Sequence, residues 1–154
     1  MENRKQNKIK VMVLFGTRPE IIKFAPVIKQ LQAQPEWFEV VIVSTGQHTD
    51  LLAPFLAGFG IEPDFKLNVM TAGQTPSDVC ARVMTAADTI LADEKPDVLL
   101  VQGDTSSALA GALAAFHRKI PVGHVEAGLR SGDPMSPFPE EMNRCLISKV
   151  ASFH

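Results

Sequence analysis

Nearly uninterrupted runs of apolar residues alternate along the chain with turns and with stretches of helical periodicity. The runs lie at residues 11–15, 38–45, 98–101 and 121–125, and a polar turn follows each of them. Strands that are covered on both faces of a parallel sheet have this continuous apolar character. The pattern therefore predicts buried parallel strands, and a short edge strand is expected at residues 64–67.

Helical periodicity fills the segments between these runs. Apolar residues recur with helical spacing up to Leu31, and an alanine-rich helix is expected after residue 104. Thr75 provides a hydroxyl at a cap position and Asp78 an acid three residues later, which predicts the start of a helix that runs to about Glu94. The other helices are expected from about residue 49 to residue 58 or 60 and from about residue 139.

This alternation, without repeats or linkers, predicts an α/β fold with a doubly wound, Rossmann-like parallel sheet. We expect a flexible tail at residues 1–10 and a single domain at residues 11–154. If the strand order is 3-2-1-4-5, the switch point lies between the first strand and the strand at 98–101. The turns at Gly16 and at Gly103-Asp104 then face each other across one crevice. A further strand could begin within residues 151–154.

Composition and charge exclude several classes of partner. The formal net charge of −2 gives no general attraction to nucleic acid or to an anionic membrane. The apolar runs have the length of strands, so we expect no transmembrane helix, and the run at 11–15 is too short for a signal peptide. Cys80 and Cys145 lie far apart in sequence and are interpreted as buried or inert thiols. Cytoplasmic location is the default expectation.

Two acids mark the ends of neighbouring strands. Asp104 follows the strand at 98–101, and Glu126 follows the strand at 121–125. Ligands of open parallel sheets bind beyond the carboxyl ends of the strands, so both side chains are expected at one crevice. They could act as a general acid and base or hold sugar hydroxyls. The alternative is that Asp104 merely caps the helix that follows it.

The Gly-Thr-Arg-Pro-Glu turn joins the first strand to a helix. Free N–H groups at such a helix start suit a phosphate, Arg18 adds a guanidinium group, and Lys23 lies farther along the same helix. The alternative is an ordinary tight turn with solvated cations. The turn matches neither a P-loop nor a dinucleotide-binding motif.

The remaining polar candidates are weaker by themselves. Glu140 and Glu141 lie in the first turn of the last expected helix, where Glu140 and Arg144 could form an ordinary i,i+4 ion pair. Gln47 and His48 follow the second strand at the same edge of the sheet. His124 lies within a strand and is interpreted as a hydrogen-bonded core residue. No second histidine stands at ligand spacing, so no metal site is expected.

Taken in order, the motifs GTRPE, Gln47-His48, GDT, HVEAGLRSGD and PEEMNR resemble those of the non-hydrolysing UDP-N-acetylglucosamine 2-epimerases. The resemblance extends over essentially the whole chain and implies the N-terminal domain of a two-domain enzyme of the GT-B type. It implies interconversion of UDP-GlcNAc and UDP-ManNAc without NAD, metal or other cofactor. The route would be anti elimination of UDP to 2-acetamidoglucal, followed by syn re-addition.

The resemblance also implies roles for single residues. Asp104, Glu126 and Glu140 fall on the family's catalytic carboxylates, and Arg18, Lys23 and Arg144 on positions of its nucleotide-sugar site. Gln47, His48 and Gln74 match a second UDP-GlcNAc site that activates bacterial members. A catalytic histidine and most uridine contacts belong to a C-terminal domain that this sequence does not match. The 154-residue chain is therefore expected to be inactive alone, and the complete enzyme to be a homodimer.

The sequence is also compatible with other functions. A hydrolysing UDP-GlcNAc 2-epimerase would release ManNAc and UDP with related residues. A GT-B glycosyltransferase would not require these three acids together. An inactive, truncated nucleotide-sugar-binding domain would bind the same ligand without turning it over. A response-regulator receiver domain is excluded, because it would need paired acids after the first strand, where this chain has Gly16-Thr17-Arg18.

Overall fold

The computed structural model describes residues 8–46 and 49–154, in which strands and helices alternate. The strands are β1 (Ile9–Phe15), β2 (Phe38–Ser44), β3 (Phe65–Lys66), β4 (Val98–Gln102) and β5 (Val122–Val125). The helices are α1 (Arg18–Gln32), α2 (Thr49–Phe59), α3 (Pro76–Glu94), α4 (Ser106–His117) and α5 (Glu140–Val150).

The first strand begins earlier than the sequence predicts. The Ile9 N–H donates to the Trp37 carbonyl at 2.8 Å, and the Lys10 N–H donates to the Asp97 carboxylate at 2.7 Å. These bonds draw residues 9 and 10 into the sheet, so the assignment of both to a flexible tail is wrong. The basic segment 1–7 lies outside the described residues.

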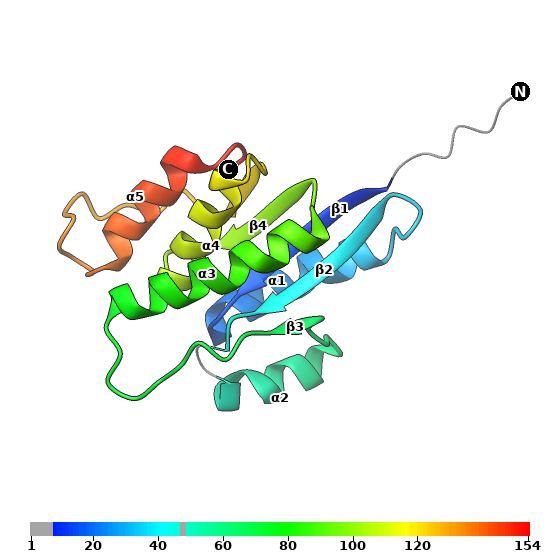
Figure 1. Cartoon of the computed structure of the whole chain (residues 1–154), viewed down its shortest axis with the longest axis horizontal. Coiled ribbons are helices and arrows are strands. Elements are labelled where there is room, and N and C mark those ends of the chain that lie inside the picture. The colour runs from blue at the N-terminus through cyan, green and yellow to red at the C-terminus, as the bar shows by residue number, and fades with distance from the viewer. Residues whose placement is uncertain (1–7, 47–48) are drawn as a thin grey trace, which may run out of the picture.

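The described strands form one parallel sheet in the order β3-β2-β1-β4-β5, which confirms the predicted doubly wound topology. Figure 1 shows α1 behind the sheet and α3 and α4 in front of it. The chain runs outward from β1 to β3 and then returns to the centre to form β4. The carboxyl ends of β1 and β4 therefore diverge at a switch point, where α/β folds place their ligands.

Alternate residues of β1 pack into two separate hydrophobic cores, one on each face of the sheet. Met12 and Leu14 are at most 1% exposed and pack with residues of α3, α4 and α5. Val13 and Phe15 are fully buried among residues of α1 and α2. Burial on both faces explains the continuous apolar pattern of residues 11–15, where every residue is buried. The middle of β1 therefore offers no polar side chain to a ligand.

The last residues of the chain pair with β5. The His124 N–H donates to the Phe153 carbonyl at 2.9 Å, the Ser152 N–H donates to the Val122 carbonyl at 2.7 Å, and Phe153 forms an isolated parallel bridge with Gly123. This is the place at which a further strand is expected to begin.

No helix within the described residues is long and apolar enough to cross a membrane.

Candidate functional site

Three turns meet at the carboxyl edge of the sheet, after β1, β4 and β5. Between them lies a pocket of about 180 Å³. It brings together both strand-end acids and two of the three predicted cations. The lining residues are Thr17, Pro19, Glu20, Lys23, Gln102, Gly103, Asp104, Thr105, Glu126, Leu129 and Arg144.

The Asp104 carboxylate faces this pocket because the neighbouring residues perform the structural tasks of its turn. Gly103 takes a positive φ of 70°. Thr105, and not Asp104, caps α4, since its hydroxyl accepts the Ala108 N–H at 3.0 Å. The alternative reading of Asp104 as the cap is therefore wrong. Its carboxylate is left to face Arg144, whose Nη1 lies 3.6 Å away.

The surroundings of Asp104 favour its protonated form. Burial is the main cause that raises the pKa of this carboxyl, and the Arg144 guanidinium opposes it. The negative charges of Glu140 and Glu126 add to the rise. A raised pKa brings a carboxyl closer to the range in which positioned acids and bases transfer protons, which favours a role of this kind for Asp104.

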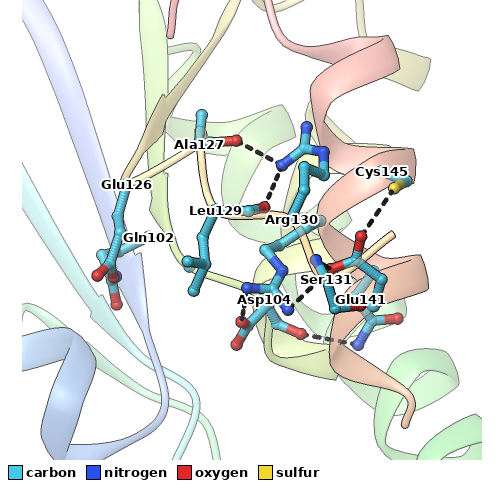
Figure 2. Close-up of polar contacts among 12 residues, drawn as sticks. Gln102, Asp104, Glu126, Ala127, Leu129, Arg130, Ser131, Glu141 and Cys145 are labelled. Atoms are coloured by element: carbon cyan, nitrogen blue, oxygen red, sulfur yellow. Dashed lines mark hydrogen bonds and ion pairs between the residues drawn. The ribbon is translucent and has the colours of Figure 1, made fainter. Parts of the chain in front are cut away.

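Glu126 follows β5 in the left-handed conformation, with φ of 61°. Lys23 of α1 and Gln102 at the end of β4 both donate to its Oε2. Figure 2 shows the Gln102 and Glu126 side chains side by side. Lys23 therefore reaches the site, as predicted, and joins α1 to the end of β5.

Arg144 lies behind Asp104 and is almost completely buried, with 3% of its side chain exposed. The predicted Glu140–Arg144 ion pair does not form. Arg144 instead pairs with Glu141, one residue later, at 3.0 Å. Glu141 also accepts the Ser131 N–H at 3.0 Å, and this bond is the main cause that lowers the pKa of Glu141 (Figure 2). The Arg144 Nε is buried and has no hydrogen-bond partner in the part of the chain that the structure describes.

Glu140 lies on the other side of Asp104. It lines a second pocket of about 390 Å³, which also includes Gln74, Thr17, Asp104 and Thr105. Asn143 fixes this side of α5, because its Nδ2 donates to the Asp104 carbonyl at 2.8 Å. Asp104 is thus shared between the two pockets. Gln47 and His48 lie outside the described residues.

Arg18 does not line either pocket. It is exposed, and its guanidinium carbon lies 5.6 Å from the centre of the Phe55 ring, in a cation–π contact with α2. The other predicted cation of this turn region, Lys23, is the one that the fold directs into the pocket.

Glu20 lines the same pocket and is the main site residue that the sequence motifs do not single out. It is 1% exposed, and its Oε2 accepts the N–H groups of Gly16 and Thr17 at 2.8 and 2.6 Å. Two donors that the sequence offered to a phosphate are therefore occupied. The other oxygen accepts the Thr105 hydroxyl at 2.9 Å. Burial raises the pKa of Glu20, and these hydrogen bonds oppose the rise.

His124 is a core residue, as predicted. It is 2% exposed, and its Nε2 lies 2.7 Å from the Gly103 carbonyl oxygen. Burial lowers the pKa of His124, so the neutral imidazole donates this bond. Among the described residues, no group of three or more His, Cys, Asp or Glu side chains is placed to hold a metal ion.

The chain is similar to UDP-N-acetylglucosamine 2-epimerases over nearly all of its length. A family model described as UDP-N-acetylglucosamine 2-epimerase matches residues 29–154. Proteins of that name from Salmonella typhimurium and Bacillus subtilis are 49% and 48% identical to it, over 95% and 96% of this chain. The chain spans 39% and 38% of the length of these relatives.

Solved structures give the same result. A crystal structure of UDP-GlcNAc 2-epimerase from Neisseria meningitidis bound to UDP-GlcNAc superposes with a TM-score of 0.91 at 44% identity, covering 95% of this chain and 39% of that one. The Methanocaldococcus jannaschii enzyme in complex with UDP-GlcNAc and UDP gives 0.86 at 39% identity, covering 94% and 39%. Acinetobacter baumannii MurG, at 22% identity and a TM-score of 0.70, shares the fold.

Proposed function

The chain belongs to the UDP-N-acetylglucosamine 2-epimerase family, and from this premise we propose that it is the N-terminal part of a non-hydrolysing enzyme that interconverts UDP-GlcNAc and UDP-ManNAc. The observation that carries the proposal is the convergence of Asp104, Glu126, Lys23 and Arg144 on one pocket at the switch point. The solved structures of relatives with UDP-GlcNAc and UDP support the choice of ligand.

The proposed reaction needs both kinds of side chain. The hydrogen on C2 of an N-acetyl sugar is not acidic, so its removal requires stabilisation of the charge that develops as the C1–O bond to UDP breaks. A carboxylate takes the C2 proton, and 2-acetamidoglucal and UDP result. Re-addition of UDP to C1 and return of a proton to the opposite face of C2 complete the epimerisation. Asp104, Glu126 and Glu140 are the proposed proton-transferring groups.

The cations are proposed to hold the diphosphate. Lys23 lies in the pocket beside Glu126, and Arg144 lies behind Asp104. Arg18 begins α1 and is proposed to leave Phe55 for the ligand when the nucleotide sugar binds. The N–H groups of Gly16 and Thr17, at the start of α1, are already bound by Glu20, so the diphosphate is assigned to the side-chain cations.

The neighbouring pocket is the proposed second UDP-GlcNAc site. Gln74 and Glu140 line it, and it shares Asp104 and Thr105 with the first pocket. A ligand there would contact the same turn as the substrate, so its binding would affect the position of Asp104. Gln47 and His48 belong to this proposal on sequence grounds alone.

The test compares this chain with a complete enzyme, made by joining residues 1–154 to the C-terminal part of the Bacillus subtilis relative. We expect the complete enzyme, a homodimer by sedimentation, to form UDP-ManNAc and to incorporate deuterium at C2 in deuterated water. We expect no exchange by residues 1–154 alone, because reacting groups must be held in near contact and the C-terminal part is proposed to hold the uridine and to close the cleft.

Each alternative has its own outcome in the same experiment. Release of free ManNAc and UDP would assign the chain to the hydrolysing branch. Binding of UDP-GlcNAc by the complete enzyme without exchange would favour an inactive nucleotide-sugar-binding protein. Exchange by the isolated chain would mean that one domain suffices and that the site is complete without the C-terminal part.

A further inference from the structure

Glu20 connects two turns that lie far apart in the sequence. Its Oε2 is held by the backbone of the turn after β1, and its Oε1 accepts the hydroxyl of Thr105, in the turn after β4. Thr105 in turn accepts the Ala108 N–H and so begins α4. Glu20 is 1% exposed, and both oxygens of its carboxylate accept hydrogen bonds from protein groups. It therefore links the starts of α1 and α4 across the switch point.

The cap of α3 shows that helix capping alone does not need such a link. Thr75 and Asp78 have the same spacing as Thr17 and Glu20, with a proline between the two members of each pair. The Asp78 carboxylate is exposed, and among the described residues it binds only the N–H and hydroxyl of Thr75, at 2.8 Å each. Both acids stabilise a helix start, but only Glu20 extends to another element.

The residues that depend on these two turns are those of the proposed active site. Lys23 lies one helical turn after Glu20 and contacts Glu126. Asp104 immediately precedes Thr105 and faces the same pocket. If the separation of the two turns changed, Lys23 would therefore move relative to Asp104. Neither side chain would lose a group with which it contacts a ligand.

We infer that Glu20 is a positioning residue, whose buried bridge from the Gly16–Thr17 backbone to the Thr105 hydroxyl sets the distance between Lys23 and Asp104 across the pocket. The consequence for catalysis rests on the function proposed above. The bridge itself is a property of the 154-residue chain and can be tested without any ligand.

The first test uses amide hydrogen exchange of residues 1–154, read by NMR. Glu20→Gln keeps the length of the side chain but replaces one accepting oxygen with an NH₂ group. We expect exchange at Thr105 and Ala108 to become at least about tenfold faster, because the link to the α4 start is weakened. The matched control is Asp78→Asn, which removes the equivalent acid of α3 and is expected to leave both amides unchanged.

A second pair of variants tests the same bridge at Thr105, the residue that donates to Glu20. Thr105→Val removes the hydroxyl and Thr105→Ser keeps it. We expect faster exchange at Gly16 and Thr17 in the valine variant and normal exchange in the serine variant. Thr75→Val, which removes the cap hydroxyl of α3, controls for the loss of a cap. This pair decides the question if Glu20→Gln does not fold.

The catalytic consequence is measured in the complete enzyme. We expect Glu20→Gln to lower kcat by about 10- to 100-fold and to change KM by less than about threefold, because a displacement of about 1 Å costs up to 10²-fold in rate. Asp78→Asn should leave both constants unchanged. A merely structural acid would lower the amount of folded enzyme and not the kcat of the folded fraction.

Two results would overturn the inference. Faster exchange confined to residues 16–21 in Glu20→Gln, with normal exchange at Gly16 and Thr17 in Thr105→Val, would make Glu20 a local cap only. A normal kcat for Glu20→Gln in an enzyme that epimerises would show that the bridge does not position the site. A wild-type complete enzyme that fails to exchange C2 hydrogen would instead refute the proposed function and leave the amide measurements unaffected.

Discussion

At the amino edge of the sheet, charged side chains pair with one another in the open. Arg118 donates to both carboxylate oxygens of Asp88, at 2.5 and 2.6 Å, and about a third to a half of each side chain is exposed. Lys10 lies between Glu39 and Glu94, at 2.9 and 3.1 Å. Each of these cations has an acid at hydrogen-bond distance.

At the carboxyl edge Arg144 and Glu141 are buried, with 3% of each side chain exposed, and the charged groups share their partners. Arg144 lies 3.0 Å from Glu141 but 3.6 Å from Asp104, and Glu126 takes both Lys23 and Gln102 on one oxygen. Burial raises the pKa of Asp104, whereas the hydrogen bond from Arg118 lowers that of Asp88. Both edges carry many charges, so the number of charges does not mark a site. A site is marked instead by charges that are partly buried and incompletely paired.

The largest effect should come from the acids of the carboxyl edge. In the complete enzyme we expect Asp104→Asn, Glu126→Gln and Glu140→Gln each to lower kcat by roughly 10²–10⁴, the usual contribution of a positioned acid or base. Asp88→Asn is the matched control at the amino edge and should keep the wild-type rate. C2 deuterium exchange measures the effect, and a folded variant with normal turnover would remove its residue from the catalytic set.

Removal of Arg144 should have the largest effect on stability. Arg144→Met keeps much of the volume but leaves Glu141 without its cation inside the protein. We expect a clear loss in the free energy of unfolding, because Glu141 keeps its bonds from the Ser131 and Gly132 N–H groups but loses the cation beside it. Urea denaturation of residues 1–154 measures it, with Arg118→Met as the control from the exposed edge. Equal urea midpoints for Arg144→Met and Arg118→Met would contradict the stated difference between the buried and the exposed arginine.

Arg18 should affect binding more than stability. We expect Arg18→Ala to weaken UDP binding to the complete enzyme by about 1.5–3 kcal/mol, the range for a hydrogen bond to a charged group. Its contact with Phe55 is exposed, so the melting temperature should change little. Calorimetry with UDP tests this, and Lys29→Ala, farther along α1 and away from both pockets, is the control. Unchanged UDP affinity would show that Arg18 stays on Phe55.

The sequence was sufficient to predict the fold and most of the pocket because both depend on local signals. Continuous apolar runs predicted buried strands, and the rule for ligand positions in parallel sheets placed Asp104 and Glu126 at one crevice, which the structure confirms. The pairing of Arg144 with Glu141 in place of Glu140 was not predictable. It depends on how α5 is rotated against the segment at Ser131, which periodicity does not encode.

Glu20 illustrates a second limit of the sequence. The spacing of Thr17 and Glu20 indicates a capping box, and the same spacing at Thr75 and Asp78 indicates another. Nothing local distinguishes the two acids. The difference arises only when β1 and β4 become neighbours and bring Thr105 to the free oxygen of Glu20. Long-range pairing, and not the motif, turns one cap into a bridge.

The two edges should also respond to pH with opposite sign. The folded-state pKa of Asp104 is raised above 3.8, so the folded state holds this proton more tightly, and its contribution to stability falls as pH rises from 3.8 through the folded value. The pKa of Asp88 is lowered from 3.8, so its contribution is present above 3.8 and is lost as pH falls through the folded value. The unfolding free energy of each variant, Asp104→Asn and Asp88→Asn, is subtracted from that of the wild type at each pH. The two differences, plotted against pH across this range, should have slopes of opposite sign. Slopes of the same sign would mean that the two environments do not differ as described.

The smallest effect should come from the best-formed ion pair of the molecule's amino edge. Arg118 and Asp88 have the two-pronged geometry in which an arginine and a carboxylate fit best, yet both are solvated. Exposed pairs contribute little, since water and salt screen the attraction and two long side chains lose freedom when they pair. We expect Arg118→Gln to change the melting temperature of residues 1–154 by no more than about 2 °C and to leave UDP binding and turnover of the complete enzyme unchanged. Thermal scans at low and high salt measure it, and any small loss should disappear at high salt because screening already weakens the pair there. A loss as large as that of Arg144→Met would mean that geometry, and not burial, separates the two edges.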